Sequence, residues 1–210
     1  MNLSKKITLV LAAVAATSAS FAQTAPAANA STGLLGQRYA EVSFGLADAQ
    51  GSSDNTYGLG VNLPVCPNVD LGFNYGYSWL NSGGLKLRDH ALNASATGYT
   101  NYAGVKPFVG VGLGYQWSKA KFGSFSTNND IGTWALGVGF EVATGEITLT
   151  PSISYVDGFK SRDAGAFNYG VEASTWITKT LGGFADVSFS DIEGSGGQSW
   201  NYTIGVRVRF

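Results

Sequence analysis

The stretch at residues 200–210 (WNYTIGVRVRF) alternates strictly between apolar and polar positions. Every even-numbered residue is apolar or aromatic, and every odd-numbered one is polar, charged or glycine. Because successive side chains of a strand point to opposite faces, this period of two predicts a β-strand with one apolar and one polar face. The same alternation begins at Arg38 and recurs between turn-forming stretches along the chain.

These alternating stretches divide residues 37–210 into about ten strands of roughly nine to twelve residues, the length that a tilted strand needs to cross a bilayer. An even number of strands brings both ends of the sheet to one side, as closure of an antiparallel barrel requires. We therefore predict an all-β fold, a closed antiparallel up-and-down transmembrane β-barrel of about ten strands. Eight strands is the alternative, if two of the stretches merge.

Interruptions of the pattern predict where the strands end or bend. The polar stretches at 118–130, 157–165 and 190–197 are predicted to be loops. Pro151 lies inside a predicted strand, where it cannot donate a backbone hydrogen bond to its neighbour. We therefore expect a β-bulge at Pro151.

The composition of the polar face favours a membrane barrel over a water-soluble one. A solvated face would be rich in Lys, Glu and Arg, whereas here it is mainly Gly, Ser, Thr, Asn and Ala, and only 13% of all residues are charged. We predict that the apolar face contacts lipid and that the polar face lines the lumen. Aromatic residues near strand ends are typical of membrane interfaces. The predicted interfacial aromatics are Trp79, Trp117, Trp134 and Tyr155.

The first 22 residues have the features of a secretory signal peptide. Two lysines precede an apolar run at 7–16, and the small residues Ser20 and Ala22 suit signal peptidase, so we expect cleavage after Ala22. Residues 23–36 are rich in Ala, Thr and Gly and lack periodicity, which predicts a flexible lead-in to the barrel.

The closing stretch, which ends on an aromatic residue, resembles the assembly signal of bacterial outer-membrane β-barrel proteins. In that family the last strand ends in Phe or Trp, and the barrel-assembly machinery reads apolar residues at every second position. The matching residues here are Trp200, Tyr202, Ile204, Val206, Val208 and Phe210. In pattern, residues 37–210 resemble small barrels such as the transmembrane domain of outer-membrane protein A and porin-like barrels. The resemblance implies Sec-dependent export to the outer membrane of a Gram-negative-type bacterium. It also implies contact with outer-membrane lipid, and with periplasmic chaperones and the assembly machinery during biogenesis.

Few charged residues fall on the face that is predicted to line the lumen. They predict either a salt-bridge network that fills a narrow lumen or a charged constriction in a small pore. The set is Glu41, Asp70, Lys106, Glu141, Glu172, Asp186, Arg207 and Arg209.

Three pairs of residues within this set are expected to lie side by side on adjacent strands of the closed barrel. Two of the pairs have opposite charges, and the third has like charges and needs a counter-charge or a raised pKa. The pairs are Glu41 with Arg207, Lys106 with Glu141, and Glu172 with Asp186.

No catalytic constellation is evident in the sequence. The single histidine, His90, falls on the predicted lipid-facing side, and the single cysteine, Cys66, lies between two prolines. We predict that Cys66 is an unpaired thiol, with an intermolecular disulfide as the alternative. Metal-ligand spacings, phosphate-binding loops and nucleophile elbows are missing, so no enzyme activity, metal or cofactor is predicted.

A net charge of −1 without basic clusters argues against nucleic acid as a partner. The predicted function is a structural or porin-like barrel that passes at most small solutes. The alternative is a surface-interaction barrel that binds ligands through its extracellular loops, and an enzyme that acts through His90 ranks last.

Overall fold

The computed structural model describes residues 25–26, 33–49, 52–82, 84–159, 165–193 and 197–210. The predicted signal peptide and its cleavage site lie outside the described residues. No helix in the described ranges is long and apolar enough to cross a membrane.

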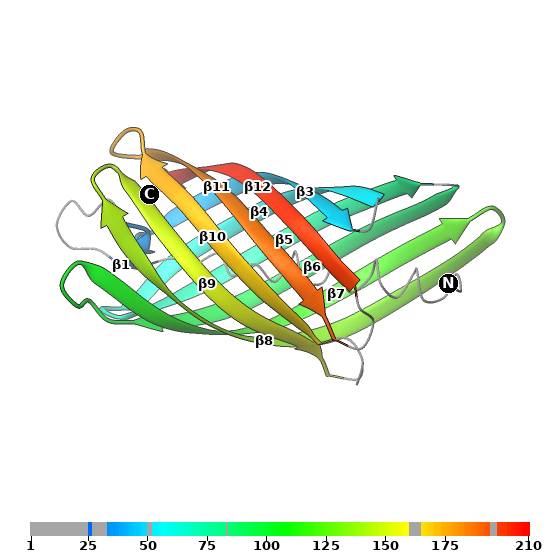
Figure 1. Cartoon of the computed structure of the whole chain (residues 1–210), viewed down its shortest axis with the longest axis horizontal. Coiled ribbons are helices and arrows are strands. Elements are labelled where there is room, and N and C mark those ends of the chain that lie inside the picture. The colour runs from blue at the N-terminus through cyan, green and yellow to red at the C-terminus, as the bar shows by residue number, and fades with distance from the viewer. Residues whose placement is uncertain (1–24, 27–32, 50–51, 83, 160–164, 194–196) are drawn as a thin grey trace.

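Ten antiparallel strands close into one barrel (Figure 1). Each strand pairs with its neighbours in sequence, and the last strand pairs with the first to complete the ring. This confirms the predicted closed antiparallel barrel and decides for ten strands over eight. The strands are β3 (Tyr39–Ala49), β4 (Ser52–Cys66), β5 (Val69–Ser82), β6 (Leu85–Tyr99), β7 (Val105–Phe122), β8 (Phe125–Thr144), β9 (Ile147–Gly158), β10 (Ala166–Trp176), β11 (Leu181–Ile192) and β12 (Gly197–Arg209).

Two short strands, β1 (Ala25–Pro26) and β2 (Leu35–Gly36), pair in parallel and form a separate two-stranded sheet that is not part of the ten-stranded ring. We call the rim where β3 begins and β12 ends the terminal end of the barrel. The opposite rim is the projecting end, because the hairpin of β7 and β8 extends beyond the other strands there (Figure 1).

Alternation along the strands places apolar side chains outside and small or polar ones inside. On β7 and β12 the outward Leu113 and Ile204 are 63% and 62% exposed, while the inward Gln116 and Asn201 are 3% and 4% exposed. The apolar surface therefore lies on the outside of the barrel, the reverse of a water-soluble barrel with an apolar core.

Outward-facing rings contact one another around the barrel toward the projecting end, and we call this set the aromatic belt. One run of contacts crosses β3 to β7 and a second crosses β8 to β12, with ring centroids 4.8 to 6.5 Å apart. All four predicted interfacial aromatics belong to it, although their position at a membrane interface stays a prediction. The belt comprises Phe44, Tyr57, Tyr75, Tyr77, Trp79, His90, Tyr115, Trp117, Trp134, Tyr155, Phe167, Tyr169, Phe189 and Trp200.

The prediction of a loop at 118–130 is wrong. β7 and β8 contain 18 and 20 residues, longer than expected, and stay paired out to Phe122 and Phe125 around Gly123, whose φ is 59°. Residues 121–130 are all exposed, so neither face of the hairpin needs apolar side chains there. Without a buried face there is no alternation to indicate a strand.

The expected bulge at Pro151 is also wrong. Between β8 and β9 the pairs Gly139↔Ser152 and Val142↔Leu149 keep one register, and only the two intervening pairs are missing. The ladder therefore opens at the proline without an inserted residue. The register shifts elsewhere, between Pro64 and Cys66 on β4.

Candidate functional site

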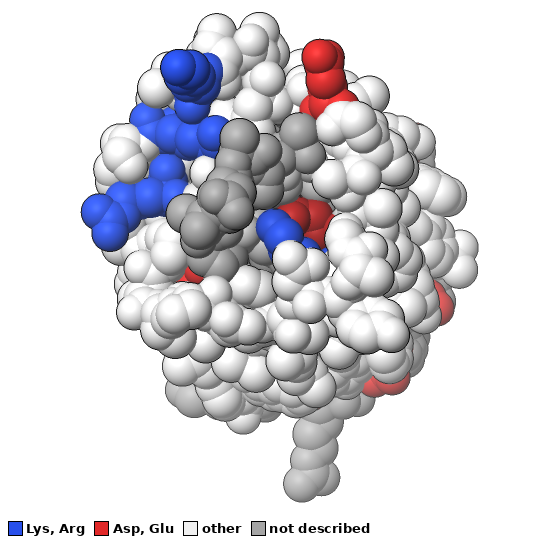
Figure 2. Space-filling model, turned by 90° about the vertical axis from the view of Figure 1, so that its left-hand side faces the viewer, with Lys and Arg blue, Asp and Glu red and all other residues white. Residues whose placement is uncertain are grey.

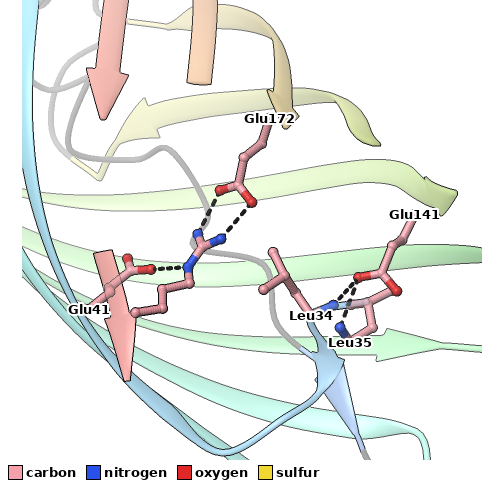
Figure 3. A network of polar contacts seen from close by, with 6 residues as sticks. Leu34, Leu35, Glu41, Glu141 and Glu172 are labelled. Carbon is pink, nitrogen blue, oxygen red and sulfur yellow. Dashed lines mark hydrogen bonds and ion pairs between the residues drawn. The ribbon is translucent and has the colours of Figure 1, made fainter. Parts of the chain in front are cut away.

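Arg207 is the centre of an ion-pair cluster inside the barrel. Its Nε donates to Glu41 Oε2 at 2.8 Å, and its two terminal nitrogens donate to the carboxylate of Glu172 at 2.8 and 2.6 Å. The guanidinium thus joins β12 to its neighbour β3 and to β10, two strands away (Figure 3). Arg207 is 1% exposed. The bidentate contact with Glu172 is the geometry in which arginine binds a carboxylate most strongly.

Aromatic rings enclose the guanidinium. Its central carbon lies 3.8 Å from the Phe184 ring centroid and 5.2 Å from that of Tyr39. Gly205 makes this packing possible, because a Cβ at that position would collide with the Phe184 ring. The rings shield the ion pairs from water, which strengthens the attraction between the charges.

The like-charge pair predicted on β10 and β11 is present. Glu172 lies opposite Asp186 in the register, and both line the same cavity as Arg207. Arg207 supplies the counter-charge that this pair needs. We call Arg207, Glu41, Glu172 and Asp186 the Arg207 cluster.

A second polar cluster holds the chain that leads into the barrel. Lys106 Nζ lies 2.8 Å from Glu141 Oε1, and the two residues are neighbours on adjacent strands, as predicted. The other oxygen of Glu141 accepts hydrogen bonds from the backbone N–H groups of Leu34 (2.7 Å) and Leu35 (2.9 Å) (Figure 3). Lys106 Nζ also donates to the Leu35 carbonyl at 3.2 Å. The Lys106–Glu141 ion pair thus binds the backbone N–H groups of Leu34 and Leu35 and the backbone carbonyl of Leu35.

We call residues 33–37 the docked segment. Leu34 and Leu35 are 3% and 1% exposed, and Leu35 packs against the inward-facing Phe108. Asn62 Nδ2 donates to the Gln37 carbonyl at 2.7 Å. The described residues 33–36 therefore differ from the predicted flexible lead-in, because the lumen buries them.

The remaining predicted lumen charges also lie on the inner face. Asp70 accepts a hydrogen bond from Asn62 Nδ2 at 3.2 Å. Arg209, near the terminal rim, stacks over Trp176 with its guanidinium carbon 3.7 Å from the ring centroid. Neither residue joins the Arg207 cluster through a direct ion pair among the described residues.

A polar cavity of about 140 Å³ extends from the Arg207 cluster toward the projecting end. Seen from the terminal end, charged atoms of both signs lie within the mouth of the barrel (Figure 2). The cavity wall is built mainly of small hydroxyl, amide and glycine positions, which include Ser43, Thr56, Asn74, Asn93, Ser152 and Asn168. Such a wall can solvate a small polar molecule.

Neither a protein-family model nor a curated protein matches this chain. Solved structures do match. The transport unit of the autotransporter AIDA-I from Escherichia coli is 12% identical, and the match covers 95% of this chain and 97% of that one with a TM-score of 0.51. This chain has the fold of an outer-membrane β-barrel.

Two further similar structures are outer-membrane barrels. The N-terminal β-barrel domain of Pseudomonas aeruginosa OprF is 14% identical, with 83% of this chain and 98% of that chain covered and a TM-score of 0.45. The outer membrane protease OmpT from Escherichia coli is 11% identical, with 83% and 97% covered and a TM-score of 0.47.

In this outer-membrane barrel fold, neither His90 nor Cys66, the two residues considered for a chemical role, points into the lumen with a reactive partner among the described residues. His90 stacks on Trp117, with ring centroids 5.2 Å apart, and its Nδ1 lies 2.8 Å from the Tyr75 hydroxyl. Cys66 is exposed and free. Among the described residues no group of His, Cys, Asp or Glu side chains could hold a metal ion.

Sequence reasoning missed the docked segment and Asn62. The lead-in lacks periodicity, so no pattern marked it as bound to the barrel. One signal was available, namely the apolar pair Leu34-Leu35 between two glycines in a stretch otherwise rich in small and polar residues.

Proposed function

We propose that this protein is an integral outer-membrane barrel of the porin-like kind, which passes at most small polar solutes. The observation that carries the proposal is the polar cavity, which is bordered by the Arg207 cluster and lined by small uncharged side chains. Charged groups at the narrow part of a lumen select solutes by size and charge. The docked segment adds a second restriction at the terminal end.

The outer surface supports a location in the membrane. Between the aromatic belt and the terminal end, the outward side chains are apolar, and the ring of strands leaves no unpaired edge. In hydrocarbon an unpaired backbone amide costs several kcal/mol, so a closed sheet is the form in which strands can cross. The longer hairpin of β7 and β8 favours the projecting end as the extracellular side.

We also propose that the protein is exported with a cleaved signal peptide and inserted by the barrel-assembly machinery, with periplasmic chaperones on the way. From Trp200 to Val208, the apolar residues of the closing stretch lie on the outward face of β12, with Trp200 and Val208 each about half exposed, at 49% and 48%. An enzymatic role is not proposed, because His90 lies on the outer face within the aromatic belt.

The pore proposal predicts a small conductance in planar bilayers that contain the refolded protein. We expect Ser43→Trp to abolish it, because Ser43 lines the cavity and an indole would fill the space. Val42→Trp is the matched control, since the outward Val42 is 54% exposed and its replacement leaves the lumen unchanged. A silent wild-type barrel, or equal conductance in the two variants, would remove the pore part of the proposal.

The projecting hairpin favours a second candidate function, binding of a surface ligand. Phe122 and Phe125 face each other next to the turn and are 44% and 80% exposed. Exposed aromatic residues are frequent anchors of binding interfaces. For this function Phe122→Ser with Phe125→Ser should abolish adhesion of cells to extracellular matrix while the conductance stays unchanged. Unchanged adhesion would leave the porin-like function alone.

A further inference from the structure

Four basic residues lie together on the outward face of β6 and β7. Lys86 is directly opposite Lys121, and Arg88 is directly opposite Lys119. All four side chains are exposed. We call Lys86, Arg88, Lys119 and Lys121 the basic cluster.

The neighbouring strands give the basic cluster little compensation. On β5 the register places Asn81 opposite Lys86, and on β8 it places Asn128 and Ser126 opposite Lys119 and Lys121. Like charges directly opposite each other destabilise a sheet. Within the described part of the chain none of the four side chains forms an ion pair.

The nearby acidic residues are directed elsewhere. Asp130 lies opposite Trp117, and its carboxylate accepts a hydrogen bond from the Tyr115 hydroxyl at 3.0 Å. Asp89 shares β6 with Arg88 but lies on the inner face, 2% exposed. The positive charge of the basic cluster is therefore available to an external anion.

The position of the basic cluster relative to the aromatic belt indicates which anion it meets. Arg88 lies two residues beyond His90 on the same face of β6, and Lys119 lies two residues beyond Trp117 on β7. Belt aromatics sit at the level of lipid headgroups, and basic residues next to a membrane attract anionic headgroups. The four cations thus lie at the level where lipid phosphates are found.

We infer that the basic cluster binds the phosphate groups of an anionic lipid in the outer leaflet, with Trp117 and His90 packing against the adjoining part of that lipid. Lysine and arginine form charge-assisted hydrogen bonds to phosphate oxygens, and two opposed pairs can hold more than one phosphate. Bound phosphate would relieve the repulsion within the basic cluster. This inference shares the membrane location with the proposed function but does not depend on an open lumen.

The test measures lipid that stays bound to the full-length barrel. The protein is reconstituted in phosphatidylcholine vesicles that contain lipid A, a phosphorylated glycolipid, then extracted with mild detergent and examined by native mass spectrometry. We expect Arg88→Ser with Lys119→Ser to retain roughly tenfold less lipid A than wild type. The matched control, Arg38→Ser with Lys179→Ser, removes two exposed charges near the terminal end and should retain lipid A as wild type does.

Three results of this experiment would overturn the inference. The first is equal retention by wild type and the basic-cluster variant, and the second is an equal loss of retention in the control variant. The third is displacement of lipid A by millimolar inorganic phosphate, which would indicate a general anion site. Lys119→Glu guards against a folding defect, because it places a carboxylate opposite Arg88 and should keep the barrel stable while it abolishes retention. Lipid A retained by Lys119→Glu would also contradict the inference. The conductance of the same variant should equal that of wild type, because the basic cluster lies outside the lumen. Failure of the lipid inference can therefore be distinguished from failure of the pore proposal.

Discussion

Replacing Arg207 with methionine is expected to lower the free energy of unfolding by about 3 to 5 kcal/mol, the cost of leaving buried carboxylates without their partner. Glu41 and Glu172 both lose a direct ion pair, and Asp186 loses the counter-charge that lines the same cavity. Urea unfolding of the refolded barrel in phospholipid vesicles, followed by tryptophan fluorescence, measures the change.

Arg209→Met is the matched control for this variant. Arg209 lies on the same strand and the same face, and it is partly exposed, with its guanidinium stacked on Trp176. Its loss should cost no more than about 1 kcal/mol, as expected for an exposed cation–π contact. Combining Arg207→Met with Glu172→Gln should recover part of the stability, because one unpaired charge is removed as well. Equal losses in the two single variants would show that the Arg207 cluster contributes nothing specific.

Glu141→Ala is expected to release the docked segment and to raise the conductance several-fold. The substitution removes the acceptor of two buried backbone N–H groups and the ion-pair partner of Lys106. A buried donor left without an acceptor costs about 1 to 3 kcal/mol, so the bound position of the segment loses its advantage. Planar-bilayer recordings measure the change, with Glu146→Ala, an exposed carboxylate in the neighbouring turn, as the control.

A labelling experiment separates release of the docked segment from a general loosening of the barrel. In a Cys66→Ser background, Leu35→Cys should be protected from a water-soluble maleimide, because Leu35 is 1% exposed. Addition of Glu141→Ala should make this thiol reactive, whereas Glu146→Ala should leave it protected. Equal labelling with and without the carboxylate of Glu141 would show that Glu141 does not hold the segment.

The fold could be predicted because lipid and lumen impose opposite chemistries on alternate residues. At 40–46 on β3 and 200–209 on β12 this contrast is unbroken, and the parity made Glu41 and Arg207 neighbours once the barrel closes. It also placed Lys106 opposite Glu141 and Glu172 opposite Asp186. Each of these predictions needed only the side of the strand and the position of the turn.

Other features depended on contacts that parity does not describe. The link between Arg207 and Glu172 skips β11, so it arises from the curvature of the closed wall rather than from strand pairing. The docked segment is held through backbone groups, which every residue carries, so the sequence of 33–37 reveals little of it. The projecting hairpin has both faces exposed, and the contrast that marks the other strands is therefore lost.

The order of the strands has a consequence for how the chain assembles. Nine of the ten ladders join neighbours in sequence, and the tenth, between β12 and β3, joins residues as far apart as Glu41 and Arg207, 166 positions along the chain. The entropic cost of closing a long loop therefore falls on the ladder between β12 and β3, which we call the seam, while each hairpin can form between residues close in sequence. Until that seam forms, the nascent sheet has two open edges, so insertion into hydrocarbon and ring closure have to proceed together.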